Sequence, residues 1–150
     1  MVKLSGLGTL HNCFNFYNFI LNMRDKDYRL VYIDLSECRG MDSTFMGMLV
    51  DIYKKYVQLN GNVWVSNPSE NALRQLNLLG ISEVIEIRNY EKDKDLKFED
   101  FSVDSTEFET EDWLKFVKKS HENLVSIDSS NKDRFGKFLQ TLQKEMTSNK

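Results

Sequence analysis

The sequence predicts an α/β domain followed by a C-terminal helical hairpin. Strand-like and helix-like stretches alternate up to about residue 88, the order expected for parallel strands joined by crossover helices. After Tyr90 acidic residues become frequent and aliphatic residues rare. Helical periodicity then returns in two stretches near the C-terminus. We therefore expect a domain at 1–90, an acidic linker at 91–109 and a helical extension at 110–147.

The composition of the whole chain is typical of a soluble globular protein. The chain has 150 residues, of which 41% are hydrophobic and 29% charged. Its net charge of −3 gives no electrostatic basis for nucleic-acid binding. No secretory signal, membrane-spanning apolar run or metal-binding cysteine and histidine motif is recognised. These features predict a cytoplasmic protein that requires no cofactor or metal and binds neither nucleic acid nor membrane.

Two strands and two helices are predicted in the first part of the chain. "VKLSGLG" alternates as a short strand that ends in a turn, and Thr9 is a plausible N-cap for the helix that follows. "YRLVYIDL" is typical of a buried central strand, and "SECRGMDS" of a loop after it. From Thr44 onward, apolar residues recur three and four positions apart. This spacing predicts an amphipathic helix that ends at Asn60-Gly61.

The rest of the chain contains two further predicted strands and three further predicted helices. The strands are "NVWVS" and "ISEVIEI". Between them a helix is expected with Asn67 as its N-cap, Pro68 at its first position and Gly80 as its stop. "TEDWLKFVKKSHENLVSI", with Thr110 as a possible cap, and "SSNKDRFGKFLQTLQKEM" then predict the hairpin. Neither hairpin helix is apolar enough to stand alone, so the hairpin should dock on the domain or on a second copy.

An ordered set of motifs connects the chain with a known family. The buried strand ends in "DLS", "MDST" and "GMLV" follow at the start of the next helix, and "LLGI" closes the helix after that. This set, within residues 2–88, resembles a STAS domain of the anti-sigma-factor antagonist type. The resemblance implies a small domain with a mixed sheet of about four strands and helices mainly on one face.

The resemblance also implies a function and a site. In that family the serine after the aspartate is phosphorylated by a partner that is both anti-sigma factor and kinase; here it is Ser43, and Thr44 is its rival. The protein would sequester that partner while Ser43 is unphosphorylated, and so affect sigma-factor-dependent transcription. A Ser/Thr phosphatase would restore the unphosphorylated state. ATP would belong to the partner, and this chain would not be an enzyme. The resemblance assigns the partner surface to Asp42, Thr44, Met46 and Gly47, with Asp34 and Ser36 beside them.

Physical chemistry supports a switch at this position. A helix N-terminus has unpaired N–H groups and partial positive charge, so it tolerates the roughly −1.5 to −2 charge of a phosphate. A docked partner would instead be repelled. We expect Ser43 to cap the helix with its hydroxyl facing solvent, and we expect Met41 and either Phe45 or Met46 to be exposed as an apolar anchor.

Three alternatives stay open. Ser43 is also explained as an ordinary N-cap with no regulatory role. The domain could be a scaffold with a degenerate switch that dimerises or binds partners through its C-terminal helices. A hydrolase that uses Ser43 has the least support, because no base is evident and "GMDST" lacks the G-x-S-x-G pattern. His121 is expected on a helix surface or in a contact within the hairpin.

Overall fold

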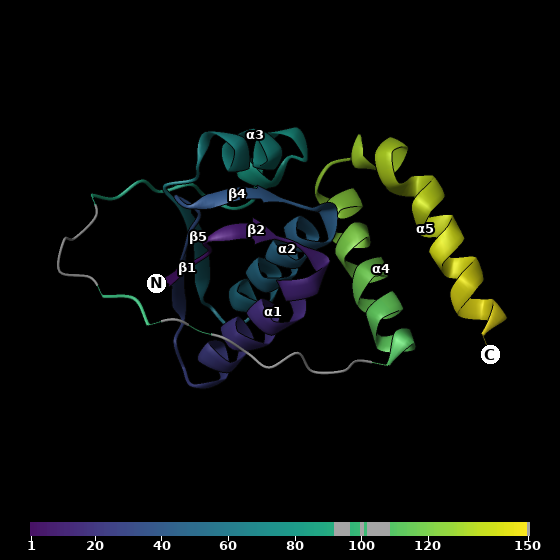
Figure 1. The fold of residues 1–150 in the computed structure, drawn as a ribbon, viewed down its shortest axis with the longest axis horizontal. Helices are drawn as coiled ribbons and strands as arrows, with labels where there is room; N and C mark the ends of the chain where they lie inside the picture. The colour runs from purple at the N-terminus through teal and green to yellow at the C-terminus, as the bar shows by residue number, and fades with distance from the viewer. Residues whose placement is uncertain (92–96, 100, 102–108, 150) are drawn as a thin grey trace.

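The described strands form two small parallel sheets in the computed structural model, which describes residues 1–91, 97–99, 101 and 109–149 (Figure 1). The strands are β1 (Val2–Lys3), β2 (Gly6–Gly8), β3 (Leu30–Asp34), β4 (Cys38–Met41) and β5 (Asn62–Ser66). One sheet has the order β1-β3-β5, and β2 pairs with β4 in the other. Most of the predicted acidic linker falls outside the described residues.

Strand pairing differs from the sequence-based expectations in three ways. First, the resemblance implied a mixed sheet, but all pairs among the described strands are parallel. Parallel pairing is what the alternation of strands and helices predicts. The predicted loop "SECRGMDS" contains β4, which forms by pairing with the distant β2. The predicted strand "ISEVIEI" is wrong: it begins as the 3-10 helix η1 (Ile81–Glu83) and makes one isolated bridge, between Val65 and Ile87.

Five α-helices lie within the described residues. They are α1 (Leu10–Asp25), α2 (Ser43–Val57), α3 (Glu70–Leu78), α4 (Thr110–Ile127) and α5 (Asn131–Ser148). Thr9 caps α1 and Gly80 follows α3 in a left-handed conformation, as predicted. The cap of α3 is Ser69 instead of Asn67, because both polar atoms of the Asn67 amide bond the backbone of Tyr90.

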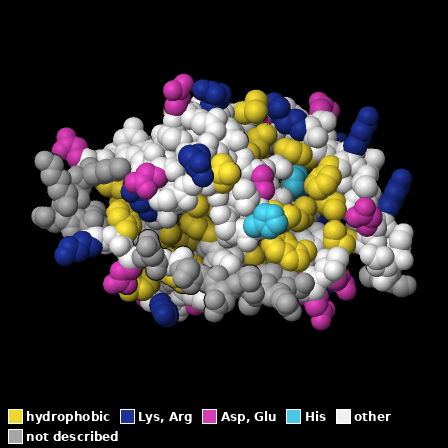
Figure 2. Space-filling view, viewed as in Figure 1, with side chains coloured by type: hydrophobic (Ala, Val, Ile, Leu, Met, Phe, Trp, Pro, Cys, Tyr) yellow, Lys and Arg dark blue, Asp and Glu magenta, His cyan; other side chains and the backbone are white. Residues whose placement is uncertain are grey.

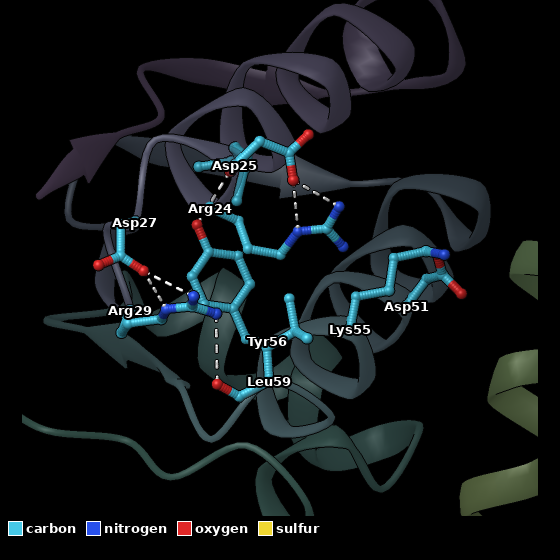
Figure 3. Close-up of polar contacts among 9 residues, drawn as sticks. Arg24, Asp25, Asp27, Arg29, Asp51, Lys55, Tyr56 and Leu59 are labelled. Carbon is cyan, nitrogen blue, oxygen red and sulfur yellow. Dashed lines mark hydrogen bonds and ion pairs between the residues drawn. The ribbon is translucent and has the colours of Figure 1, made fainter.

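Helix α2 lies at the centre of the fold. Most of its residues are buried, and its apolar side chains share one hydrophobic core with β3, β5 and α1. The hydroxyl of Tyr56, in α2, donates a hydrogen bond to the backbone carbonyl of Ile20 in α1 at 2.9 Å. Figure 3 draws Tyr56 among the polar contacts of this region. A helix packed in this way has few exposed residues. At its N-terminus Ser43 is half-buried, so this end of α2 keeps some access to solvent.

The C-terminal hairpin, α4 and α5, docks on the domain of its own chain. Figure 1 shows α4 beside α2, with α5 on the outer side of α4. Leu124 of α4 is fully buried and belongs to the same core as α2. Phe116 of α4 packs edge-on against Phe14 and Tyr17 of α1, with ring centroids 5.5 and 5.4 Å apart. Docking supplies the apolar contacts that neither hairpin helix has alone.

Candidate functional site

Asp42 caps the N-terminus of α2. One carboxylate oxygen accepts a hydrogen bond from the backbone N–H of Phe45 at 2.8 Å, and the other accepts from the N–H of Leu10 at 2.7 Å. A carboxylate can serve two helix N-termini at once, and its charge suits both helix dipoles. The prediction that Ser43 caps α2 is therefore wrong. Ser43 is instead the first helical residue, which leaves its hydroxyl available for another contact.

That contact is made with His121 of α4, so the hydroxyl faces α4 instead of facing solvent as predicted. The half-buried hydroxyl of Ser43 lies 2.9 Å from Nε2 of His121, although the two residues are 78 positions apart in the chain. Nδ1 of His121 lies 2.8 Å from the carbonyl oxygen of Val117, an atom that can only accept. Nδ1 therefore carries the proton of the neutral ring, and the Ser43 hydroxyl donates to Nε2.

His121 is enclosed by the hairpin. The residue is 3% exposed, and its ring packs edge-on against Phe135 and Phe138 of α5, with centroids 5.0 and 4.7 Å apart. Burial lowers the pKa of His121, and the hydrogen bond to Val117 and the charge of Asp42 oppose that effect without cancelling it. The neutral form that accepts from Ser43 is thus favoured.

No local sequence pattern locates a base near Ser43, and the expectation that none is placed there is wrong. His121 approaches only because α4 folds back over α2. Figure 2 shows hydrophobic side chains gathered around the histidine side chains, on the face where α1 and α4 lie in Figure 1. No local motif encodes such a contact between segments this distant.

The predicted apolar anchor is not exposed. Met41 and Met46 are each 6% exposed, and Phe45 is fully buried. The ring of Phe45 packs against that of Phe16 at 5.3 Å between centroids, so it belongs to the core between α1 and α2. The helix starts too deep in the fold for its first turn to present apolar side chains. Met41, Phe45 and Met46 therefore stabilise the domain instead of forming an exposed anchor.

Thr44 is less accessible than Ser43. The Thr44 residue is only 6% exposed, whereas Ser43 is half-buried. The two residues are adjacent in the chain, but successive helical residues point in different directions, so Thr44 points toward the interior and Ser43 lies beside α4. Of the two candidate hydroxyls, Ser43 is the one nearer to solvent.

Asp34 and Ser36 lie at the carboxyl end of β3. Asp34 is 1% exposed, and its carboxylate accepts from the N–H of Ser36 at 2.7 Å and from the hydroxyl of Tyr90 at 2.7 Å. Burial by itself raises the pKa of Asp34, but these hydrogen bonds and the charge of Lys3 outweigh it, so the pKa is below its ordinary value. The Asp34 carboxylate is thus used within the fold, while Ser36 is half-buried.

Gly47 lies against α4. A Cβ atom on Gly47 would overlap the backbone carbonyl oxygen and carbon of Ser120. Only a glycine allows the two helix backbones to approach so closely at this point. The predicted partner residue Gly47 is therefore covered by the hairpin.

A polar network joins α1, α2 and α4 one turn further along α2. Asp51, which is 8% exposed, accepts hydrogen bonds from the Tyr17 hydroxyl at 2.6 Å and from the Asn123 amide at 3.1 Å. Nζ of Lys54 donates to Asn123 at 3.1 Å and to the hydroxyl of Ser126 at 2.7 Å. The buried polar groups at the junction of the helices are thus paired with one another.

The described ranges offer neither a metal-binding cluster nor a membrane-spanning helix. No group of three or more His, Cys, Asp or Glu residues there is placed to hold a metal ion. None of the helices described has both the length and the apolar character needed to cross a membrane.

Comparison with known proteins assigns the domain. The family model of the STAS domain matches residues 1–94, a range that ends before α4. Two curated relatives, the anti-sigma-B factor antagonists of Listeria monocytogenes and Listeria innocua, are each 33% identical over 66 residues. Each match covers 44% of this chain, and the chain spans 58% of the length of these relatives.

Solved structures share the fold. The NMR structure of the protein TM1081 has a TM-score of 0.54 and 22% identity, and the match covers 58% of this chain and 70% of that one. The crystal structure of the same protein from Thermotoga maritima also has a TM-score of 0.54 and 22% identity, covering 59% of this chain and 78% of that one. At this identity the likeness concerns the fold alone.

Proposed function

Because this chain belongs to the STAS domain family, we propose that it is an anti-sigma factor antagonist whose binding is switched by phosphorylation of Ser43. The two Listeria relatives, which are anti-sigma-B factor antagonists, support the first part. The observation that carries the second part is the position of Ser43: it is the first residue of α2, with its hydroxyl uninvolved in capping and nearer to solvent than that of Thr44.

The proposed switch acts on a partner and leaves the fold of the STAS domain itself intact. A phosphate on Ser43 would lie at the positive end of α2, where the helix dipole favours an anion. A partner docked on the same surface would meet about two negative charges and added bulk. Bare Ser43 therefore corresponds to the binding state and phosphorylated Ser43 to the released state.

The partner we propose is a cytoplasmic anti-sigma factor with serine kinase activity. ATP binds to that partner, and its γ-phosphoryl group is transferred to the Ser43 oxygen, which loses its proton, while ADP leaves. A Ser/Thr phosphatase then hydrolyses the phosphate ester with water and releases inorganic phosphate. In this scheme the chain is a substrate and a binding protein, not an enzyme. The rest of the predicted partner surface stays a prediction: Ser36 is half-buried at the end of β3, whereas Met46 is buried and Gly47 is covered by α4 in this structure.

Capture of partners by the full chain tests the proposal. Tagged wild type, Ser43→Ala and Ser43→Asp would be expressed in the source organism, and bound proteins and phosphopeptides identified by mass spectrometry. We expect wild type and Ser43→Ala to capture an anti-sigma factor, Ser43→Asp to lose it, and the phosphate to be on Ser43. Ser129→Asp, which adds the same charge at an exposed serine of the hairpin turn, is the control and should bind normally.

Other outcomes distinguish the alternatives. Equal capture of the anti-sigma factor by wild type and Ser43→Asp would contradict the switch and favour the scaffold with a degenerate switch. Phosphorylation of Ser43→Ala to the same extent as wild type would rule out Ser43 as the phosphosite and favour Thr44. A homodimer formed through the hairpin also stays a prediction, and light scattering on the full chain measures it directly.

One observation favours a second candidate function. The Ser43 hydroxyl and Nε2 of His121 have the hydrogen-bond geometry of a nucleophile and its general base. His121 is oriented by the carbonyl of Val117 instead of by a carboxylate. A hydrolase would label with a fluorophosphonate probe at Ser43, and His121→Ala would abolish the labelling. Absence of labelling in the wild type removes this candidate.

A further inference from the structure

The α4 helix covers the helix on which the proposed switch stands. At Gly47 the backbones of α2 and α4 are in direct contact, because no room is left for a Cβ atom beside the carbonyl of Ser120. Gly47 is four residues, about one helical turn, after Ser43. A partner therefore cannot reach this part of α2 while α4 is docked.

The same helix also engages the Ser43 hydroxyl in a hydrogen bond. His121 accepts the hydrogen bond from Ser43, and Phe135 and Phe138 of α5 pack behind the His121 ring. Transfer of a phosphate to the oxygen of Ser43 requires that this hydrogen bond be given up. A kinase also needs space in front of the hydroxyl, which the hairpin partly fills.

The hairpin is an addition to the STAS domain and is joined to it partly by polar contacts. The family match ends at residue 94, whereas α4 begins at Thr110. Asn123 connects the hairpin to Asp51 and Lys54 of α2. Polar contacts of this kind can be exchanged for water or for groups of a partner with less change in free energy than buried apolar surface.

We propose that the hairpin is a built-in competitor of the partner: docked on α2, it blocks the partner surface and holds the Ser43 hydroxyl on His121, and it must leave before the partner binds. This inference rests on the proposed function for the identity of the partner. The competing partner is a protein that presents its own surface to α2 around Gly47 and Ser43. Until the hairpin is released, the partner surface of the full chain is therefore covered and the Ser43 hydroxyl stays bonded to His121.

Substitution of Asn123 in the full chain tests the proposal, since this residue holds the hairpin and lies outside the proposed partner surface. Asn123→Asp places a buried carboxylate against that of Asp51, and Asn123→Ala removes the hydrogen bond without adding charge. Gln140→Glu makes the same amide-to-acid change at an exposed position of α5 and is the matched control. Hydrogen exchange would be measured over α4, α2 and β5, together with affinity for the anti-sigma factor captured by the wild type.

The expected result is faster exchange in α4, unchanged exchange in β5, and affinity about tenfold tighter than that of the wild type in at least one Asn123 variant. Gln140→Glu should match the wild type in both measurements. Two results would overturn the proposal that the hairpin competes with the partner and leave the proposed function standing. The first is faster hydrogen exchange in α4 with an affinity for the anti-sigma factor no tighter than that of the wild type. The second is hydrogen exchange in α4 that neither Asn123 variant makes faster. If no anti-sigma factor is captured even by a variant with α4 released, the proposed function itself fails, and the competitor fails with it.

Discussion

The carboxylate of Asp42 accepts a hydrogen bond from the backbone N–H of Leu10 at 2.7 Å and so joins the N-termini of α1 and α2. The same carboxylate caps α2 through Phe45. Two helices that begin 33 residues apart in the chain are thereby fixed to one side chain. This arrangement holds the first turn of α2, and with it Ser43, in a defined position.

Loss of the Asp42 carboxylate should destabilise the domain. Asp42→Ala removes the cap of α2 and leaves the partly buried N–H of Leu10 without its acceptor, so we expect the free energy of unfolding to fall by roughly 2–4 kcal/mol. Asp42→Asn keeps one carbonyl oxygen and should lose less. Urea denaturation of the three full-length proteins measures the difference. Equal stability of Asp42→Ala and wild type would contradict the double role of this side chain.

Gly47 should tolerate no side chain while α4 is docked. Gly47→Ala raises helix propensity by about 1 kcal/mol, but its methyl group overlaps the Ser120 backbone. We expect a net loss of about 1–3 kcal/mol in the free energy of unfolding, with faster hydrogen exchange in α4. Gly136→Ala is the matched control, because a Cβ there meets only Lys132 at 4.0 Å. That variant should be more stable than wild type, and a similar gain from Gly47→Ala would refute the close contact.

Stability should depend on pH through His121. Burial lowers its pKa in the folded state below the ordinary 6.5, so in the window below pH 6.5 the unfolded chain binds more protons than the folded one. The free energy of unfolding therefore falls as the pH is lowered through this window, and stops changing for this reason once His121 is protonated in both states. Urea midpoints at pH 7.5 and 5.5 would show a smaller decrease in His121→Gln than in wild type. The exposed His11, replaced in the same way, provides the control.

Tyr90 should ionise at unusually high pH. Burial, followed by the hydrogen bond and charge of Asp34, raises the pKa of Tyr90 to about 12. Absorbance titration of wild type and Tyr90→Phe isolates this phenol by difference, and Asp34→Asn should bring its pKa down toward the ordinary value of 10. Because the folded pKa is the higher one, the contribution is complete below pH 10 and is lost as the pH rises toward 12. An unchanged pKa in Asp34→Asn would show that the contact does not hold Tyr90.

Local sequence patterns determined most of the helices. Thr9, Gly80 and the apolar spacing of residues 44–59 encode where α1, α3 and α2 lie, because helix caps and periodicity depend on neighbours within one or two turns. Strand β4 was missed for the opposite reason: "CRGM" has no strand pattern, and only β2, paired through Leu7 and Gly40, makes it a strand. The cap at Ser69 was displaced from Asn67 by a contact with Tyr90, which again is distant in the chain.

The sequence by itself determined the α/β order, the family and the presence of Ser43 at a helix start, since each of these is carried by residues close together in the chain. Tertiary structure alone decided that Asp42 is the cap, that Met41, Phe45 and Met46 are buried, and that His121 receives the Ser43 hydroxyl. The physical reason is that burial and hydrogen bonding at this surface depend on how α1 and α4, both distant from it in the chain, pack on α2. The approach of α4 is set by the backbone contact at Gly47.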